Sequence, residues 1–511
     1  MTTGPLAPGV FVKEQPSGVR TITGAGTSTP AFLGYSLRGP GDLTASPPTL
    51  VRSWPEFVDL FHFRPPHPVE AVEEELKTLV KAIEEVSGEL KPLEDHLREA
   101  ATGEPEPTVT PEAFDKLVAV RTAQWQDQPV APADEEAAAA TATTVSEAHP
   151  DEYTQWNSTG ARLLPLHQRQ AELTALKEHL DEAKTYQLAE AVYGFFANGG
   201  TSCYILRLDH AQGLAAQVDG DPVARTGLAG LKTVPEVTMV AVPDLWSKGT
   251  DAATGATVIS KVAGHCTTMR NRLALLEPPP GTAPGDVAGF LTKLASPDTT
   301  DAEFTTLYYP WVNVPGVDGT PRTVPPCGHI AGVWARTDAE RGVFKAPANQ
   351  NLRGVLTLPT LLTEDRHGEL NAHGVNCLRV FPDRGLLVWG ARTRSSSRDW
   401  KYLNVRRLVS FLSGSIRQST TWAVFEPNDD RLWATLRHSV TSFLTDQWRQ
   451  GALQGRTPDE AFYVICDNTN NTPATIDNGE VHCDIGIAPV RPAEFVHFTI
   501  TQIADGPAQS G

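Results

Sequence analysis

The stretch that decides the fold reads GHIAGVWARTDAERGVFKAPANQNLRGVLTL over residues 328–358 and HGVNCLRVFPDRGLLVWGARTRSSSRDWKYLNVRRLVSFL over residues 373–412. Within it, Val375–Phe381 is an apolar run, residues 382–385 (PDRG) have the composition of a turn, and residues 386–391 are a second apolar run. This pattern predicts a β-hairpin. A helix is expected from about Asp399 to Gln418, with an apolar stripe wide enough to lie on the hairpin.

Two parts of this stretch resemble a known family. ARTDAERGVFKAPAN (residues 335–349) and WGARTRSSSRDWKYLNVRR (residues 389–407) look like the C-terminal domain of contractile phage tail sheath proteins and of their relatives in phage-derived injection systems. The resemblance extends over about residues 8–63 and 186–503. It implies a structural, non-enzymatic subunit without cofactors, which forms six-fold rings stacked helically around an inner tube and contracts to drive that tube through a target envelope.

Both ends of the chain contain short segments that favour strands. An isolated strand leaves its backbone groups unpaired, so Val10–Lys13 needs a sheet edge from elsewhere, unless it is a disordered tail. The final segment alternates in polarity, as a half-buried strand does. The resemblance implies that such arms link subunits, and the residues expected there are Gly9, Val10, Phe11, Val12, Lys13, Phe495, Val496, Phe498 and Ile500.

An insertion of about 120 residues interrupts the resemblance. Apolar residues between Val69 and Leu97 follow a heptad spacing, and a second apolar seam runs from Leu166 to Ala183. These seams predict an antiparallel, surface-exposed coiled-coil hairpin, bent or interrupted at Pro92, with a shorter helix over Pro111–Trp125. Residues 126–150 are expected to be a mobile link because proline, acidic residues and threonine surround their alanines.

Charge is concentrated in this insertion. Residues 65–150 hold 19 acidic and 6 basic side chains, about −13 of the formal net charge of −18. An acidic chain of this kind is a poor candidate for binding nucleic acid. The expected fold class is therefore α/β and α+β multidomain. Its parts are a linking arm (1–20), an α/β sheath domain (21–64 with 186–327), the acidic helical insertion (65–185), an α+β core domain (328–490) and a linking strand with a tail (491–511).

A second helix is expected in the core domain, from Asp430 to about Gln450, with Asp429 or Asp430 as its cap. Strands should follow at residues 462–466 and 481–488. By analogy with the family, this helix is the candidate inner-tube contact, and the residues assigned to it are Arg431, Arg437, His438, Gln447 and Arg449.

Motifs of catalysis are missing from the sequence. It contains no Gly-Lys dipeptide for a P-loop, no GxSxG nucleophile elbow and no HExxH. The six cysteines form no CxxC pair and are interpreted as reduced core residues, with little weight on a metal at His482–Cys483. Arginines at positions 392, 394, 398, 406 and 407 are interpreted either as a solvated face or as a contact with an acidic neighbour. An α/β enzyme is the weaker alternative.

Location and partners follow from the same observations. No run of 18 apolar residues and no signal peptide is found, which favours assembly in the cytoplasm without direct membrane insertion. The partners implied by the resemblance are further copies of the chain, an inner tube protein, and baseplate and cap components. Whether the particle is a virion tail or a bacterial injection device stays open.

Overall fold

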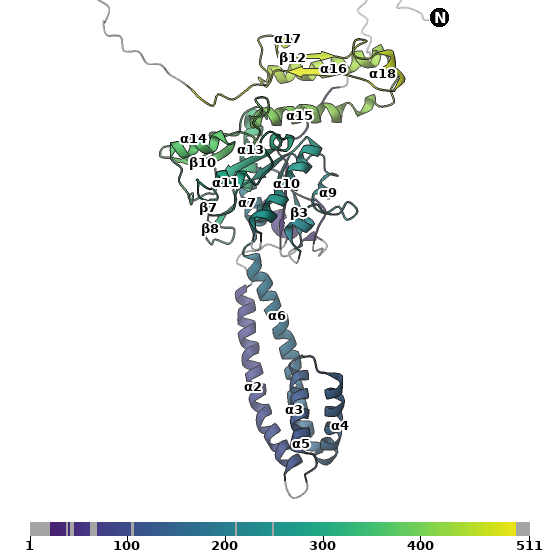
Figure 1. Cartoon of the computed structure of the whole chain (residues 1–511), viewed down its shortest axis with the longest axis vertical. Helices are drawn as coiled ribbons and strands as arrows, with labels where there is room; N and C mark the ends of the chain where they lie inside the picture. Colours follow the sequence, from purple (N-terminus) through teal and green to yellow (C-terminus); the bar gives the residue numbers. More distant parts are fainter. Residues whose placement is uncertain are drawn as a thin grey trace, which may run out of the picture. The chain divides into compact units, whose positions relative to one another are not determined.

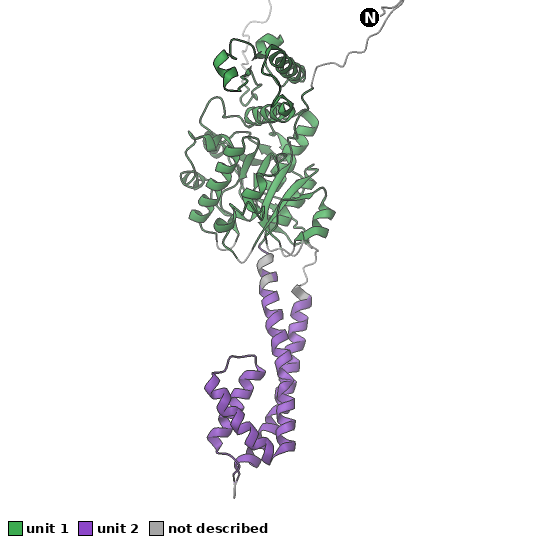
Figure 2. Cartoon of the chain, turned by 90° about the vertical axis from the view of Figure 1, so that its right-hand side faces the viewer, with its two compact units in different colours: residues 1–63, 186–511 green, residues 64–185 purple. Residues whose placement is uncertain are grey.

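The computed structural model describes residues 21–36, 39–40, 45–61, 69–103, 107–209, 212–247 and 250–496. The chain divides into two compact units, residues 1–63 with 186–511 (unit 1) and residues 64–185 (unit 2) (Figure 2). Residues 9–13, Phe498 and Ile500 of the predicted arms lie outside the described residues.

A nine-stranded sheet lies at the centre of unit 1, in the order β2-β3-β1-β4-β5-β6-β10-β11-β9. From β3 to β10 neighbouring strands run parallel, whereas β2, β11 and β9 are antiparallel to their neighbours. The strands are β1 (Pro30–Tyr35), β2 (Thr49–Val51), β3 (Cys203–Leu208), β4 (Met239–Ala241), β5 (Leu273–Leu276), β6 (Thr305–Tyr309), β9 (Gln350–Asn351), β10 (Val375–Phe381) and β11 (Gly385–Trp389).

Both faces of this sheet are covered. Phe32 and Ile205 join a core cluster with α7 (Leu188–Ala197) and α13 (Cys327–Arg341), and Leu33 on the alternate side of β1 is equally buried. The helices α7 and α13 cross closely, because a Cβ added to Gly194 would stand 2.5 Å from the His329 ring. Such continuous apolar strands are typical of parallel sheets covered on both sides.

Further helices and a β-hairpin surround the sheet. They are α1 (Trp54–Phe61), α8 (Leu214–Gln217), α9 (Gly227–Leu231), η2 (Pro243–Trp246), α10 (Ala252–Met269), α11 (Val287–Leu291), α12 (Thr300–Glu303), α14 (Glu364–Ala372) and the hairpin of β7 (Val312–Val314) and β8 (Arg322–Val324). Asp251 caps α10, since its carboxylate accepts a hydrogen bond from the Thr254 amide. The boundary expected at residue 327 does not separate two sheets, because β6 and β10 pair directly.

The predicted hairpin is confirmed by the antiparallel pair β10–β11. The helix after it, α15 (Leu403–Ser419), begins four residues later than expected. The reason is a backbone pairing, in which Thr393 N–H donates to Lys401 C=O and Leu403 N–H donates to Ala391 C=O, so that Tyr402 between them is held extended. The expectation that α15 lies along the hairpin is wrong: Leu403 joins the large core, whereas Leu408 and Leu412 belong to another cluster.

That other cluster forms a second layer of unit 1, made of α15, α16 (Asp430–Arg449) and a small sheet of β12 (Phe462–Ile465) and β13 (Asp484–Ile487). Figure 1 shows α15, α16 and β12 together at one end of unit 1. The predicted cap of α16 is confirmed at Asp429, which accepts hydrogen bonds from the amides of Arg431 and Leu432. Short helical turns flank this layer: η3 (Thr421–Ala423), α17 (Pro458–Ala461) and α18 (Pro473–Asp477).

Unit 2 is helical and has its own core. Its described helices are α2 (Val69–Thr102), α3 (Pro111–Trp125), α4 (Pro132–Ala148), α5 (Pro150–Ala161) and α6 (Leu163–Ala183), and α2 packs against α5 and α6 (Figure 1). The helix α2 continues through Pro92. The mobile link expected at residues 126–150 is wrong, because α4 occupies most of it and buries Ala138, Ala142 and Val145.

Candidate functional site

The small sheet of β12 and β13 presents open edges. Its register pairs Phe462 with Ile487, and Ala488 N–H donates to Ala461 C=O at 2.8 Å. In an antiparallel pair, inward and outward backbone groups alternate, so the N–H and C=O of Val464 and Ile485 point away from the partner strand. Within the described residues this sheet has two strands, so these outward groups meet no third strand. Open edges of this kind accept a strand from another chain.

The two faces of the small sheet differ. Phe462 and Ile487 pack towards α15 and α16, whereas Tyr463 is 57% exposed and Ile465 is 40% exposed. The Tyr463 ring lies over Gly486, where an added Cβ would stand 2.1 Å from the ring. A two-stranded sheet is marginal by itself, and here it gains its stability from the helices beneath it.

The segment that follows the N-terminal arm is fastened to α15. Thr23 N–H donates to Ser419 Oγ at 3.2 Å and Ala25 N–H to Ser415 Oγ at 2.9 Å. Ile22 is buried in the same cluster as Leu412 of α15. Residues 22–25 are therefore held on α15, in the cluster that also includes Phe462 of the small sheet.

The segment that precedes the C-terminal end is bound to the same helix and to Arg392, which follows β11. Asn404 of α15 donates to Val490 C=O at 3.1 Å, and Arg392 binds both carboxylate oxygens of Glu494 at 2.6 Å. Burial opposes ionisation, yet the hydrogen bonds from Arg392 and Asn371 hold the pKa of Glu494 below its usual range. Beyond this clamp Phe495 is 68% exposed and Val496 is 65% exposed.

Four of the five arginines in the cluster are buried, so its interpretation as a solvated face is wrong for these four. Arg407 is 4% exposed and forms a bidentate ion pair with Asp338 of α13, at 2.5 and 2.9 Å. Arg406 lies over the rings of Trp400 and Phe304, and burial lowers its pKa to about 10. Of the five, Arg398 is exposed. The partners are distant in sequence, so no local pattern could have revealed these contacts.

Arg407 also holds the N-terminal segment. Its guanidinium donates to Thr27 C=O at 3.1 Å and lies 4.5 Å from the centre of the Trp334 ring. One side chain of α15 therefore connects α13, which lies under the large sheet, with the segment that leads to the N-terminal arm. Sequence reasoning missed Ser415, Ser419 and Asn404, whose role depends on which backbone groups the fold brings to them.

The residues predicted to contact an inner tube are not equivalent. Arg431, His438 and Arg449 are exposed and are spaced by 7 and 11 positions, which places them along one line of α16. Arg437 donates to Cys466 C=O within the chain, and Gln447 is buried. The inner-tube contact stays a prediction, and the predicted residues that are exposed are Arg431, His438 and Arg449.

Two negative findings concern the described residues. Nowhere among them do three His, Cys, Asp or Glu side chains gather as a metal site requires. None of the helices described combines the length and apolar character that a membrane crossing needs.

Comparison with known proteins agrees with this architecture. Residues 226–394 match the model of the phage tail sheath protein central domain, and residues 395–503 match that of the phage tail sheath C-terminal domain. The chain belongs to the phage tail sheath family. This sheath family is structural and non-enzymatic.

Curated relatives of this sheath chain include the tail sheath proteins of Enterobacteria phage T4 (28% identical over 189 residues) and of Vibrio phage KVP40 (28% over 179 residues). These matches cover 36% and 34% of the chain. The matched region spans only 28% and 26% of the length of those relatives.

Solved structures match over nearly the whole chain. The helical sheath of the anti-feeding prophage in its contracted state is 25% identical with a TM-score of 0.58, and the match covers 98% of this chain and 100% of that one. The contracted sheath complex of PVC, an extracellular contractile injection system, is 21% identical with a TM-score of 0.59, covering 98% and 99%. The second likeness concerns the fold alone.

Proposed function

We propose that this sheath chain polymerises as stacked hexameric rings around an inner tube and shortens to drive that tube through a target envelope. The observation that carries this proposal is the pair of open strand edges at β12 and β13, beside which the N-terminal segment is anchored. A strand donated by a neighbouring copy extends such a sheet through main-chain hydrogen bonds. Twenty residues span at most about 66 Å when extended, at about 3.3 Å each, and in this proposal the residues before Thr21 reach a neighbouring subunit.

The segments bound to α15 allow subunits to stay linked to one another while the body of each subunit stays rigid. In this proposal the arms stay paired with neighbouring small sheets while the bodies of the subunits rotate and slide. Contacts that repeat without closing on themselves generate a helical filament. Contraction then draws on free energy stored at assembly, as a metastable lattice repacks into one with more favourable contacts.

Partners follow from the same scheme. The exposed line Arg431, His438 and Arg449 on α16 is the proposed inner-tube contact. Solved relatives include a structure described as the baseplate of the anti-feeding prophage, 25% identical with a TM-score of 0.58, with the match covering 98% of this chain and 99% of that chain. By analogy we propose that this chain meets baseplate and cap components at the ends of the sheath. The likeness to this prophage favours an injection device over a virion tail.

Removal of residues 2–18 tests the proposal. The truncated chain should fold, since its described core begins at Ile22, but it should not polymerise. Negative-stain electron microscopy of both chains, with the inner tube protein added, measures this. Full-length protein should form hollow tubes of uniform width, and truncated protein should stay dispersed. Normal tubes from the truncated chain would refute strand donation, and dispersed full-length chain would refute polymerisation.

A further inference from the structure

Two cysteines face each other across the end of the small sheet. Because Ile465 pairs with Asp484, the next opposed pair is Cys466 and Cys483. The hydrogen-bonded pair Ala461 and Ala488 lies five steps away, so the cysteines fall at a position without cross-strand hydrogen bonds. Opposite Cβ atoms come closest at such positions, at about 4.5 Å in general, which is the upper end of the range that a disulfide spans.

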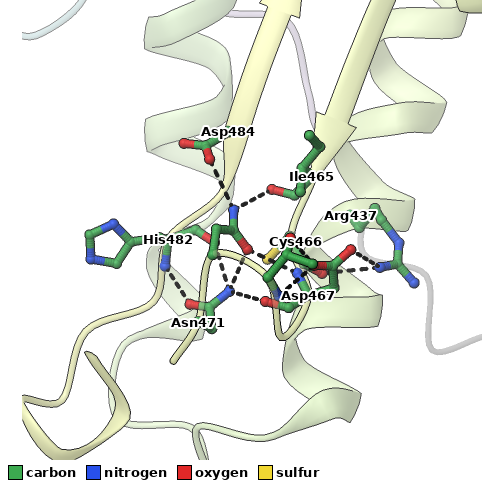
Figure 3. A network of polar contacts seen from close by, with 9 residues as sticks. Arg437, Ile465, Cys466, Asp467, Asn471, His482 and Asp484 are labelled. Carbon is green, nitrogen blue, oxygen red and sulfur yellow. Dashed lines mark hydrogen bonds and ion pairs between the residues drawn. The ribbon is translucent and has the colours of Figure 1, made fainter. Parts of the chain in front are cut away.

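An amide clamp holds the two strand ends together (Figure 3). Asn471 is 2% exposed, and its side-chain nitrogen donates to Asp467 C=O at 3.0 Å and to His482 C=O at 2.9 Å. Its side-chain oxygen accepts from His482 N–H at 2.7 Å. Asp467 and His482 are the direct neighbours of the two cysteines in the chain, so this clamp fixes the backbone on both sides of the pair.

The two thiols already interact. Hydrogen bonding to Cys483 lowers the pKa of Cys466, and the same contact raises the pKa of Cys483. Cys466 is buried and Cys483 is partly exposed, so a small reagent reaches the pair from one side. By contrast, the other four cysteines are fully covered, and burial raises their pKa: Cys203, Cys266, Cys327 and Cys377.

We propose that Cys466 and Cys483 are a redox modification site, which closes into a cross-strand disulfide when a low-molecular-weight disulfide is present. One protein thiolate breaks the S–S bond of the reagent, forms a mixed disulfide and releases one small thiol. The other protein thiolate then displaces the second small thiol. Two protein thiols become one disulfide, and the reagent takes up two electrons and two protons.

The disulfide would stabilise the small sheet and leave the edges of β12 and β13 free to pair. It joins the two ends of the loop of residues 467–482, which returns from β12 to β13, and it constrains the unfolded chain. The outward groups of Val464 and Ile485 lie on the strand edges, away from the new bond. The sheet would therefore be held together covalently in an oxidising medium while its edges stay available. This inference does not depend on polymerisation.

Incubation of the purified full-length chain with oxidised glutathione tests the site. Alkylation of all remaining thiols under denaturing conditions, followed by peptide mass spectrometry, should show a loss of two of the six thiols and a linked peptide pair containing Cys466 and Cys483. The four covered cysteines should be alkylated in full.

Two serine variants provide the controls. Cys483→Ser should keep all five of its thiols, since Cys466 is buried, and Cys466→Ser should gain one glutathione at Cys483. Three results would overturn the proposal in the wild-type chain: no loss of thiols, a stable glutathione adduct at Cys483 without a linked peptide, or disulfide-linked dimers of the chain.

Discussion

At the scale of single residues, the second layer depends on charges that are taken out of water and paired. Arg407 and Asp338 are each 4% exposed in their side chains and bind one another through two hydrogen bonds. The desolvation of two ions roughly cancels their attraction, so such a pair adds little net stability over an apolar pair. Removing one partner is different, because the other is left charged and buried.

Replacement of Asp338 by alanine should therefore lower the free energy of unfolding by about 3–5 kcal/mol. The measurement is urea unfolding of the full chain at neutral pH. A double variant, Arg407→Met with Asp338→Leu, should recover most of the loss, and Arg398→Ala on the exposed arginine should change stability by less than about 0.5 kcal/mol. Equal losses in the single and double variants would show that packing, not charge, explains the effect.

A buried histidine makes the free energy of unfolding depend on pH. His265 of α10 is 6% exposed, and burial, together with the charges of Arg272 and Lys232, lowers its pKa to about 3. Unfolded histidine has a pKa near 6.5, so below that pH the unfolded chain binds more protons than the folded one. The stabilisation is complete above about pH 6.5 and is lost as pH falls towards 3.

For His265→Gln we expect a weaker loss of stability on acidification. At pH 5 the wild-type chain should have lost about 2 kcal/mol of its stability at neutral pH through this residue, and the variant should not. Urea unfolding at pH 7.5 and at pH 5 measures the difference, with His438→Gln on the exposed face of α16 as the control. Identical pH slopes in the wild type and in His265→Gln would contradict the assignment.

At the scale of elements, the clamp between Arg392 and Glu494 sets where the C-terminal end leaves the body of unit 1. Glu494→Gln should release residues 491–496 while the helices and the large sheet stay folded, because a neutral amide binds the guanidinium more weakly. Hydrogen–deuterium exchange should rise several-fold in peptides covering residues 488–496. Glu426→Gln, on an exposed carboxylate, is the control. Unchanged exchange in Glu494→Gln would mean that Asn404 and the backbone bonds suffice.

An element could be predicted from the sequence where the residues that cause it lie close together in the chain. The hairpin and α16 were predicted because a turn and a cap are encoded within a few residues. The start of α15 was not, since it depends on a pairing with residues 391–393. For α4 the signal was present but misread: Pro132 opens the helix and alanine is the best helix former. The burial of Arg392 and Arg407 depends on partners 102 and 69 positions away.

At the scale of the whole molecule, the two units have separate cores. Among the described residues, the core of unit 2, which includes Phe114, Trp125 and Trp156, contains no residue of unit 1. The large core of unit 1 likewise contains none of the residues between 64 and 185 that the structure describes. Each unit is therefore expected to fold without the other.

Deletion of residues 64–185, with a short glycine–serine linker in their place, should leave unit 1 folded. Circular dichroism should show a cooperative thermal transition with reduced helix content, and the isolated segment 64–185 should be helical and monomeric. If the proposed function is right, the shortened chain should still form tubes in the electron microscope. Aggregation of both parts would show that the cores depend on one another.

The double attachment at α15 has a mechanical consequence. Ser415, Ser419 and Arg407 hold the N-terminal segment, and Asn404, near the start of the same helix, holds the C-terminal one. Tension on the N-terminal side would reach α15 through the packing of Ile22 and the hydrogen bonds with Ser415 and Ser419. Tension on the C-terminal side would reach the Arg392–Glu494 ion pair first and Asn404 of α15 second, because Glu494 lies nearer that end than Val490. The two ends of the chain would therefore load different contacts, although both segments are bound to the same helix.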